Sequence, residues 1–198
     1  MPQAGPKQGL LIQDTTPRAQ VLAPFPVAKA YDYRIPSTLT SSLAPGDYVK
    51  VPLGRKETVG VSESSSGGLV SAVLLAVPGA SAYYQGGAVV YTGPAGIAFL
   101  GATKEKRGDI RSSSEPWALL AAELVRGQLR STWGLAETGA AGPTGNRYGD
   151  AAGHTCVAVV GPNGKKIART LETGSSDREA NMRAFAMEAL KLMDEQLS

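Results

Sequence analysis

The feature that most constrains this chain is a short β-branched segment that leads through a Ser/Gly turn into an apolar run. Val59-Gly60-Val61 continues through Ser62-Glu63-Ser64-Ser65-Ser66-Gly67-Gly68 into the apolar run from Leu69 to Val77. Glycines let the backbone turn tightly and approach a ligand closely. The first N–H groups of the following helix lack partners within it and favour an anion. The segment predicts a strand, a turn and a helix, with a turn that can hold a phosphate and that offers three candidate nucleophiles.

The same alternation of strand and helix patterns continues to the C-terminus. We predict strands at 59–63, 87–92, 133–138, 155–160 and 166–172, and helices at 68–77, 115–131 and 177–197. The second helix follows Ser114 and has Pro116 in its first turn, where a missing N–H group costs nothing. The third begins at the capping box Ser176-Asp177-Arg178-Glu179. Residues 59–198 are therefore expected to form a layered α/β/α domain with a mixed sheet.

Residues 1–58 differ in character from the rest of the chain. Residues 1–19 are mostly Pro, Gly and polar residues and are expected to form a loose arm. Prolines at 24, 26, 36, 45 and 52 argue against helix in the next segment, where 21–23, 31–35 and 48–51 are expected to be extended. The chain is thus expected to have three parts: the arm (1–19), a β-rich segment (20–58) and the α/β domain (59–198).

Composition excludes several classes of protein and site. The net charge of +3 arises in residues 1–61, with seven basic and four acidic side chains, and is too mild to indicate nucleic-acid binding by itself. The single cysteine and single histidine exclude an intrachain disulfide and a multi-Cys or multi-His metal site, so we expect no metal and no cofactor. Cys156 is expected in the core, and His154 is a candidate base or, with more weight, a satisfied structural residue.

The sequence contains no sign of membrane insertion or export. No apolar run approaches the roughly 18 residues that a membrane span needs. The first seven residues lack the apolar core of a signal peptide. We therefore expect a cytoplasmic protein without membrane contact.

A second loop rich in glycine and hydroxyl groups follows the strand predicted at 133–138. It reads Glu137-Thr138-Gly139-Ala140-Ala141-Gly142-Pro143-Thr144-Gly145. Loops after strand ends in an α/β sheet are where ligands usually bind, so the two loops can face one crevice. Neither loop has the Gly-Lys-Ser/Thr of a P-loop or the Gly-x-Gly-x-x-Gly of a dinucleotide site. The alternatives are a ligand site between the loops and a pair of tight structural turns.

Several motifs in residues 59–198 follow the pattern of one known family. Residues 62–68 are similar to Ala-Glu-Ser-x-Thr-Gly-Gly, and residues 138–143 to Ser/Thr-Gly-x-Ala-Gly-Pro. Residues 77–87 and the strand that ends at Tyr91 follow in register, and residues 173–183 are similar to a closing Gly-Asp-Arg-x-x-x-Arg region. In these motifs the chain resembles the C-terminal domain of the CinA (competence/damage-inducible) family. The resemblance implies the same α/β fold and favours a homo-oligomer.

The resemblance implies an amidohydrolase that converts nicotinamide mononucleotide to nicotinic acid mononucleotide and ammonia without a metal. Ser64 or Ser66 would attack the carboxamide, with a lysine five residues after the tyrosine that matches Tyr91 as its base. The loop at 138–145 would hold substrate and help to stabilise the oxyanion. The implied substrate contacts are Glu63, Gly67, Gly68, Tyr91, Thr138, Gly139, Ala141, Gly142, Thr144 and Arg178.

One position departs from this family pattern. Gly96 stands where the family has the lysine. A serine hydroxyl without a base is a weak nucleophile at neutral pH, so the amidase reaction is expected to be impaired. The alternative is a catalytically inactive homologue that binds a nucleotide or serves in assembly.

Residues 20–61 are similar to a different protein. The matching segments are Val21-Leu22-Ala23-Pro24-Phe25-Pro26-Val27, Ala30 to Pro36, and Pro45 to Arg55. They resemble the start of the 3′-DNA-end binding domain of the primosomal helicase PriA. That resemblance implies that Tyr31, Asp32 and Tyr33 contact a terminal nucleotide, partly by stacking. The alternative, which we favour, is that both tyrosines are packed β residues. The chain is interpreted as a natural or engineered composite whose two parts meet at Val59-Gly60-Val61.

Overall fold

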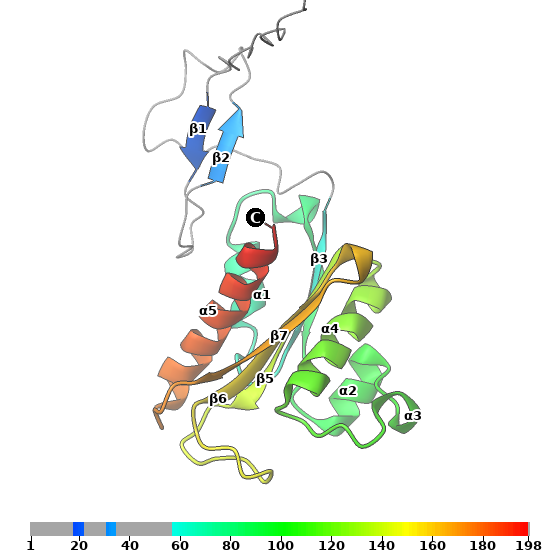
Figure 1. The fold of residues 1–198 in the computed structure, drawn as a ribbon, viewed down its shortest axis with the longest axis vertical. Coiled ribbons are helices and arrows are strands. Elements are labelled where there is room, and N and C mark those ends of the chain that lie inside the picture. The colour runs from blue at the N-terminus through cyan, green and yellow to red at the C-terminus, as the bar shows by residue number, and fades with distance from the viewer. Residues whose placement is uncertain (1–17, 22–30, 35–56, 198) are drawn as a thin grey trace, which may run out of the picture. The chain divides into compact units, whose positions relative to one another are not determined.

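The computed structural model describes residues 18–21, 31–34 and 57–197 of this chain (Figure 1). Two short strands, β1 (Arg18–Val21) and β2 (Tyr31–Arg34), pair antiparallel with Val21 opposite Tyr31. They belong to one compact unit, and all elements from β3 onward belong to another. Residues 18 and 19 lie in β1, so the predicted arm is wrong at these two positions. The rest of that arm and the extended segment predicted at 48–51 lie outside the described residues.

The second unit is built on a mixed five-stranded sheet, as predicted. Its strands are β3 (Val59–Glu63), β4 (Tyr84–Val89), β5 (Trp133–Ala140), β6 (His154–Val160) and β7 (Lys166–Glu172). The order across the sheet is β4-β3-β5-β6-β7. The first three strands of that order are parallel, and β6 and β7 are antiparallel to their neighbours. The carboxyl ends of β4, β3 and β5 therefore share one edge.

Helices cover both faces of this sheet (Figure 1). One face packs on α1 (Leu69–Leu75) and α5 (Arg178–Leu197) through buried aliphatic side chains such as Val61, Val159 and Leu192. The other face packs on α4 (Glu115–Leu129), whose Ala122 and Trp117 belong to a second buried cluster. Successive β6 residues enter alternate clusters, as the two-residue period of a strand requires. The layered α/β/α architecture predicted for residues 59–198 is confirmed.

The largest differences from the prediction lie between residues 84 and 107. The strand predicted at 87–92 is β4, at 84–89, and two further helices follow it, α2 (Gly93–Leu100) and α3 (Lys104–Arg107). Gly93, Pro94 and Gly96 resemble a loop in the sequence. Thr92 nevertheless caps α2, because its hydroxyl accepts a hydrogen bond from the N–H of Ala95 at 3.3 Å, and proline is tolerated in a first turn. Among the described residues no helix is long and apolar enough to cross a bilayer.

Candidate functional site

The candidate site lies where the parallel strands end. β3 ends at Glu63 and leads into residues 64–68, called the serine loop below. β5 ends at Ala140 and leads into residues 141–153, called the β5–β6 loop. Because β3 and β5 are adjacent and parallel, with Ser62 opposite Ala136, both loops leave the same edge of the sheet. The expectation that the two loops lie close together agrees with this register.

Glu63 organises the start of α1 from inside the protein. Its side chain is only 1% exposed. One carboxylate oxygen accepts hydrogen bonds from Ser71 N at 2.8 Å and Ser71 Oγ at 2.6 Å. The other accepts from Ser66 Oγ at 2.9 Å, Gly68 N at 3.0 Å and Val70 N at 2.9 Å. The unpaired donors of this helix start are therefore occupied by a carboxylate of the chain itself.

Glu137, on the neighbouring strand β5, accepts hydrogen bonds from the serine loop. One of its oxygens accepts hydrogen bonds from Ser64 N at 3.0 Å, Ser66 N at 2.9 Å and Ser66 Oγ at 2.8 Å. The other accepts from Ser65 Oγ at 2.5 Å and Thr155 Oγ1 at 3.0 Å. In the sequence, Glu137 belongs to a glycine-rich motif, and no local pattern indicates its role. Its place beside Glu63 follows from the β3–β5 register.

These contacts correct the idea that the turn after β3 is an open phosphate cradle. The N–H groups of Ser64, Ser66 and Gly68 already donate to carboxylates. A phosphate or a further carboxylate brought to the same donors would have to displace the buried carboxyl groups of Glu63 and Glu137. The hydroxyl of Ser66 lies within hydrogen-bond distance of both glutamates but has one hydrogen, so it donates to one of them at a time.

The three serines of the loop differ sharply in access to solvent. Ser66 is fully buried and Ser65 is nearly so, and the hydroxyls of both contact glutamate carboxylates. Ser64 is partly exposed, and its hydroxyl has no hydrogen-bond partner within the part of the chain that the structure describes. Of the two candidate nucleophiles named from the sequence, Ser64 is the one that a substrate can reach. Glu63, named as a substrate contact, is buried and can act on a ligand only through the loop that it holds.

Arg178 joins three of the predicted substrate contacts. At the first residue of α5, its Nη1 donates to the carbonyl oxygen of Gly142 at 2.6 Å and its Nη2 to Tyr91 Oη at 3.2 Å. The Tyr91 side chain is 61% exposed and follows the end of β4. The β5–β6 loop is held from α5 a second time, because Asn181 Nδ2 donates to Ala141 O at 2.8 Å. The phenol and the serine loop thus follow the ends of the adjacent strands β4 and β3, and the cation comes from the start of α5.

The other predicted substrate contacts divide by exposure. Gly67 and Thr144 are exposed, and Gly68 and Gly139 are partly exposed. Thr138 and Ala141 are buried, and the Thr138 hydroxyl accepts a hydrogen bond from Ser113 N at 3.3 Å. A ligand at this edge can reach the first four residues directly. Thr138 and Ala141 support the loop from behind.

Position 96, where the family pattern has a lysine, holds a glycine, which has no side chain to act as a base. Gly96 is buried in α2, and a Cβ added there would lie 3.6 Å from Val90, 3.9 Å from Trp117 and 4.0 Å from Ala102. These are ordinary contacts, so the position tolerates a side chain sterically. They are also apolar, so a lysine there would have to extend past the cluster between α2 and α4.

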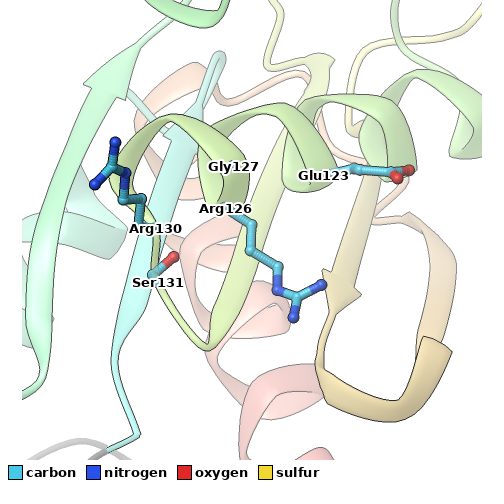
Figure 2. A pocket seen from close by; sticks show the side chains of 5 residues that line it. All are labelled: Glu123, Arg126, Gly127, Arg130 and Ser131. Carbon is cyan, nitrogen blue, oxygen red and sulfur yellow. The ribbon is translucent and has the colours of Figure 1, made fainter.

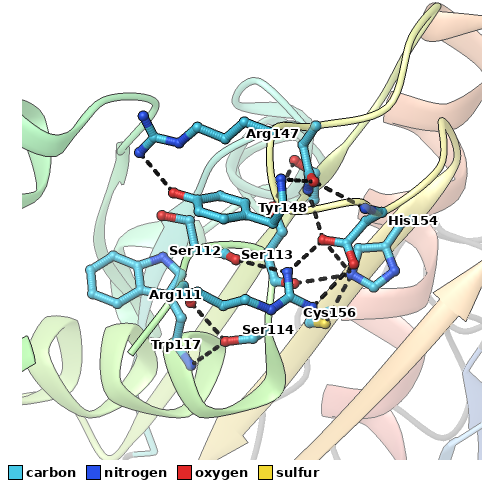
Figure 3. Close-up of polar contacts among 12 residues, drawn as sticks. Arg111, Ser112, Ser113, Ser114, Trp117, Arg147, Tyr148, His154 and Cys156 are labelled. Atoms are coloured by element: carbon cyan, nitrogen blue, oxygen red, sulfur yellow. Dashed lines mark hydrogen bonds and ion pairs between the residues drawn. The ribbon is translucent and has the colours of Figure 1, made fainter. Parts of the chain in front are cut away.

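His154 and Cys156, on β6, are held in a polar cluster beside the β5–β6 loop (Figure 3). The buried His154 ring contacts Glu172 Oε1 through Nδ1 at 2.5 Å and Ser113 O through Nε2 at 3.0 Å. Both ring nitrogens are occupied, as expected for a structural histidine. Burial raises the pKa of the Cys156 thiol, which agrees with a core residue rather than a nucleophile.

The features that lie away from the strand edge offer no comparable site among the described residues. Within residues 57–197, no group of three His, Cys, Asp or Glu side chains could hold a metal ion. A shallow pocket at the C-terminal end of α4 is lined by Glu123, Arg126, Gly127, Arg130 and Ser131 (Figure 2). It lies next to Trp133, where β5 begins, at the end of the strand opposite the serine loop. Tyr31, Asp32 and Tyr33 lie in β2, and the structure does not describe their side chains.

Sequence comparisons match both parts of the chain. The model of the CinA C-terminal domain family matches residues 46–197, and that of a 3′ DNA-binding domain matches residues 20–66. A CinA-like protein of Anaeromyxobacter sp. (strain Fw109-5) is 40% identical over 139 residues, which are 70% of this chain and 33% of the relative. A CinA-like protein of Gloeobacter violaceus is 35% identical over 136 residues, 69% of this chain and 32% of the relative. The chain thus spans about a third of the length of these relatives.

Solved structures agree with the family match. The competence/damage inducible protein CihA from Agrobacterium tumefaciens superposes with a TM-score of 0.67 at 27% identity, over 72% of this chain and 87% of that one. A competence-damaged protein (CinA) superfamily protein from Enterobacter cloacae gives 0.68 at 26% identity, over 74% and 85% of the two chains. Fold, motifs and register lead to one conclusion: the chain belongs to the CinA C-terminal domain family.

Proposed function

We propose that the chain binds a nicotinamide nucleotide at the strand edge and hydrolyses its carboxamide slowly, with Ser64 as the nucleophile. The observation that carries this proposal is the pair of hydrogen bonds from Arg178 to Gly142 and Tyr91, at the same edge of the sheet as the partly exposed Ser64. A guanidinium group suits a phosphate or carboxamide oxygen, and a phenol can stack on or hydrogen-bond to a base or ribose. Hydrogen bonds to Glu63 and Glu137 hold the backbone of the serine loop, including the N–H group of Ser64.

Slow turnover follows from the residue at position 96. General base catalysis contributes about a hundredfold to ten-thousandfold in rate, and the glycine supplies no base. The N–H group of Ser64 donates to Glu137 and is not free to stabilise an oxyanion. Both features favour binding over chemistry. Binding without hydrolysis is therefore the second candidate function, and Gly96 is the observation in its favour.

Ammonia release from nicotinamide mononucleotide distinguishes these functions. We expect slow release by the wild-type chain and no release above background by Ser64→Ala, with nucleotide affinity unchanged in calorimetry. Equal release by both chains would eliminate Ser64 as the nucleophile. Affinity without any release would support the binding homologue, and the absence of both would overturn the proposal.

A Gly96→Lys variant tests why turnover is slow. If the missing base limits the rate, a folded variant should release ammonia about a hundredfold faster than wild type. Circular dichroism shows whether the variant is folded, and Gly96→Met is the matched control for side-chain length without an amine. A folded Gly96→Lys chain that is no faster than Gly96→Met would contradict the explanation.

We also propose residual binding of DNA 3′ ends by residues 31–33, supported by the family match to residues 20–66. A single strand with a free 3′-hydroxyl should bind more tightly than one with a 3′-phosphate. Anisotropy measurements on labelled strands check this. Equal affinities would remove the proposal.

Association of the chain with itself is proposed from its exposed apolar side chains. Val89, Ile97 and Phe99 are 43%, 56% and 58% exposed, near the edge strand β4 and on α2. Apolar groups of this size in contact with water favour an interface. Light scattering should give a mass above 20.5 kDa. A monomer at all concentrations would exclude self-association.

A further inference from the structure

A second feature lies outside the proposed amidase chemistry: two arginines direct their charge toward one pair of hydroxyls. Arg107, the last residue of α3, donates from Nη2 to Ser112 Oγ at 2.8 Å. Arg147, in the β5–β6 loop, donates from Nη2 to Tyr148 Oη at 2.8 Å, as Figure 3 shows. Arg111 lies between the two pairs, because its Nη1 donates to Ser112 O at 3.3 Å and its guanidinium group lies 5.8 Å from the centroid of the Tyr148 ring. Each of the two hydroxyls therefore accepts a hydrogen bond from one guanidinium group.

The two cations of this cluster are not balanced by carboxylates. Over the residues that the structure describes, neither Arg107 nor Arg147 has an acidic partner. The neighbouring Arg111 differs, because its two terminal nitrogens contact Asp150 at 2.6 and 3.1 Å. Arg111 and Arg147 lie 5.8 and 5.0 Å from the centroid of the Tyr148 ring. The phenol is thus fixed between cations, of which only Arg111 is neutralised.

We propose that Arg107, Ser112, Arg147 and Tyr148 form a binding site for a phosphate monoester. Guanidinium groups match phosphate oxygens in a bidentate manner, and the two hydroxyls supply further hydrogen bonds. A dianion between the arginines would remove their mutual repulsion. This site does not depend on hydrolysis of an amide.

The titration of Tyr148 supports this assignment. Its pKa is lowered by the hydrogen bonds from Ser112 and Arg147 and by the charges of Arg147 and Arg107, against an opposing effect of burial. The hydrogen bonds outweigh the effect of burial on this pKa, and the two arginine charges act in the same direction as the hydrogen bonds. A bound phosphate would cancel those charges, so the pKa of Tyr148 should rise when phosphate is added.

Titration with inorganic phosphate, followed by backbone NMR at constant ionic strength, tests the site. We expect saturable shifts at Ser112 and Tyr148 in the wild type. Arg147→Gln should weaken binding about tenfold, the change expected for loss of one charge-assisted hydrogen bond. Arg183→Gln is the matched control, because Arg183 is an exposed arginine on α5 that pairs with Glu179, and it should bind phosphate as wild type does. Absence of saturable binding, or equal losses in both variants, would overturn the proposal.

Arg107 needs a more conservative change because it also packs on Trp117, at 4.5 Å from the ring centroid. Arg107→Lys keeps the charge but not the bidentate fork, and should weaken phosphate binding while the fold is retained. Nicotinamide mononucleotide and its unphosphorylated nucleoside then identify the source of the phosphate. If the nucleotide uses this site, Arg147→Gln weakens binding of the nucleotide and leaves binding of the nucleoside unchanged. If the nucleotide binds equally well to Arg147→Gln, the site takes a separate phosphate compound.

Discussion

The two glycine-rich loops at the strand edge look alike in sequence and have opposite electrostatic organisation. The serine loop directs its N–H and hydroxyl donors inward, onto the buried carboxylates of Glu63 and Glu137. The β5–β6 loop places Arg147 outside, next to Tyr148, with no carboxylate partner among the described residues. Glycines and hydroxyls therefore do not by themselves make an anion site. A loop of this kind can bind an anion only if its donors are not already hydrogen-bonded to a carboxylate of the protein.

The largest expected effect is loss of the buried carboxylate under the serine loop. Glu63→Leu leaves three N–H groups and the Ser71 hydroxyl without their acceptor, whereas the Ser66 hydroxyl keeps Glu137. We expect the free energy of unfolding to fall by at least about 3 kcal/mol, because buried donors without partners are costly. Urea denaturation measures it. Glu179→Leu, an exposed change on α5, should cost less than about 0.5 kcal/mol, and similar losses in both variants would contradict the role of Glu63.

The next effect separates the two serines. Ser66→Ala removes the hydroxyl between the glutamates and should cost about 1–2 kcal/mol of stability. Ser64→Ala should change stability by less than about 0.5 kcal/mol, since its hydroxyl has no partner in the described part of the chain. The same urea experiment compares them. A larger loss for Ser64→Ala would reverse the assignment of structural and accessible serine.

A smaller effect concerns the ion pair that holds the β5–β6 loop. The hydrogen bond from Arg111 lowers the pKa of Asp150 below its usual value of 3.8, helped by Asn146 and by the charges of His154 and Arg111. A carboxylate with a lowered pKa stabilises the fold above its unfolded pKa, and this contribution is lost as the pH falls through the folded value. Asp150→Asn should therefore cost about 1 kcal/mol at pH 7, and less with each step of pH below 4. A difference from wild type that stays constant between pH 7 and pH 2.5 would exclude this pair as the cause.

The smallest effect is expected at the exposed cation. Arg147→Gln should change the free energy of unfolding by less than about 0.5 kcal/mol, although it weakens phosphate binding. Thermal or urea unfolding without phosphate checks this. A decrease of more than about 1 kcal/mol in the free energy of unfolding would mean that Arg147 stabilises the fold and would contradict its assignment as a ligand-binding residue.

Much of the fold follows from local patterns. The bounds of β3 and β7 agree with the prediction, and β6 and α5 differ by one residue at the start, because their hydrophobic periods are local signals. The cap of α5 differs from the predicted capping box, since Asp177 Oδ1 accepts the hydrogen bond from Ala180 N at 3.1 Å. The sequence does not predict helix α2, because Gly93, Pro94 and Gly96 each disfavour helix. Burial of Leu100 against α4 favours the helix in the folded protein. Packing of this kind depends on residues far away in the chain.

The sequence by itself determined the layered α/β/α architecture, the two loops at one edge of the sheet and the glycine in place of a basic residue at position 96. Those properties depend on periodicity, turn residues and the identity of single positions. Only the tertiary structure decided which serine is accessible and which loop is already neutralised. The reason is register: with Ser62 opposite Ala136, the next residues along β3 and β5 are Glu63 and Glu137. Their carboxylates meet under the serine loop because the two strands pair in this register, and no local pattern specifies that pairing.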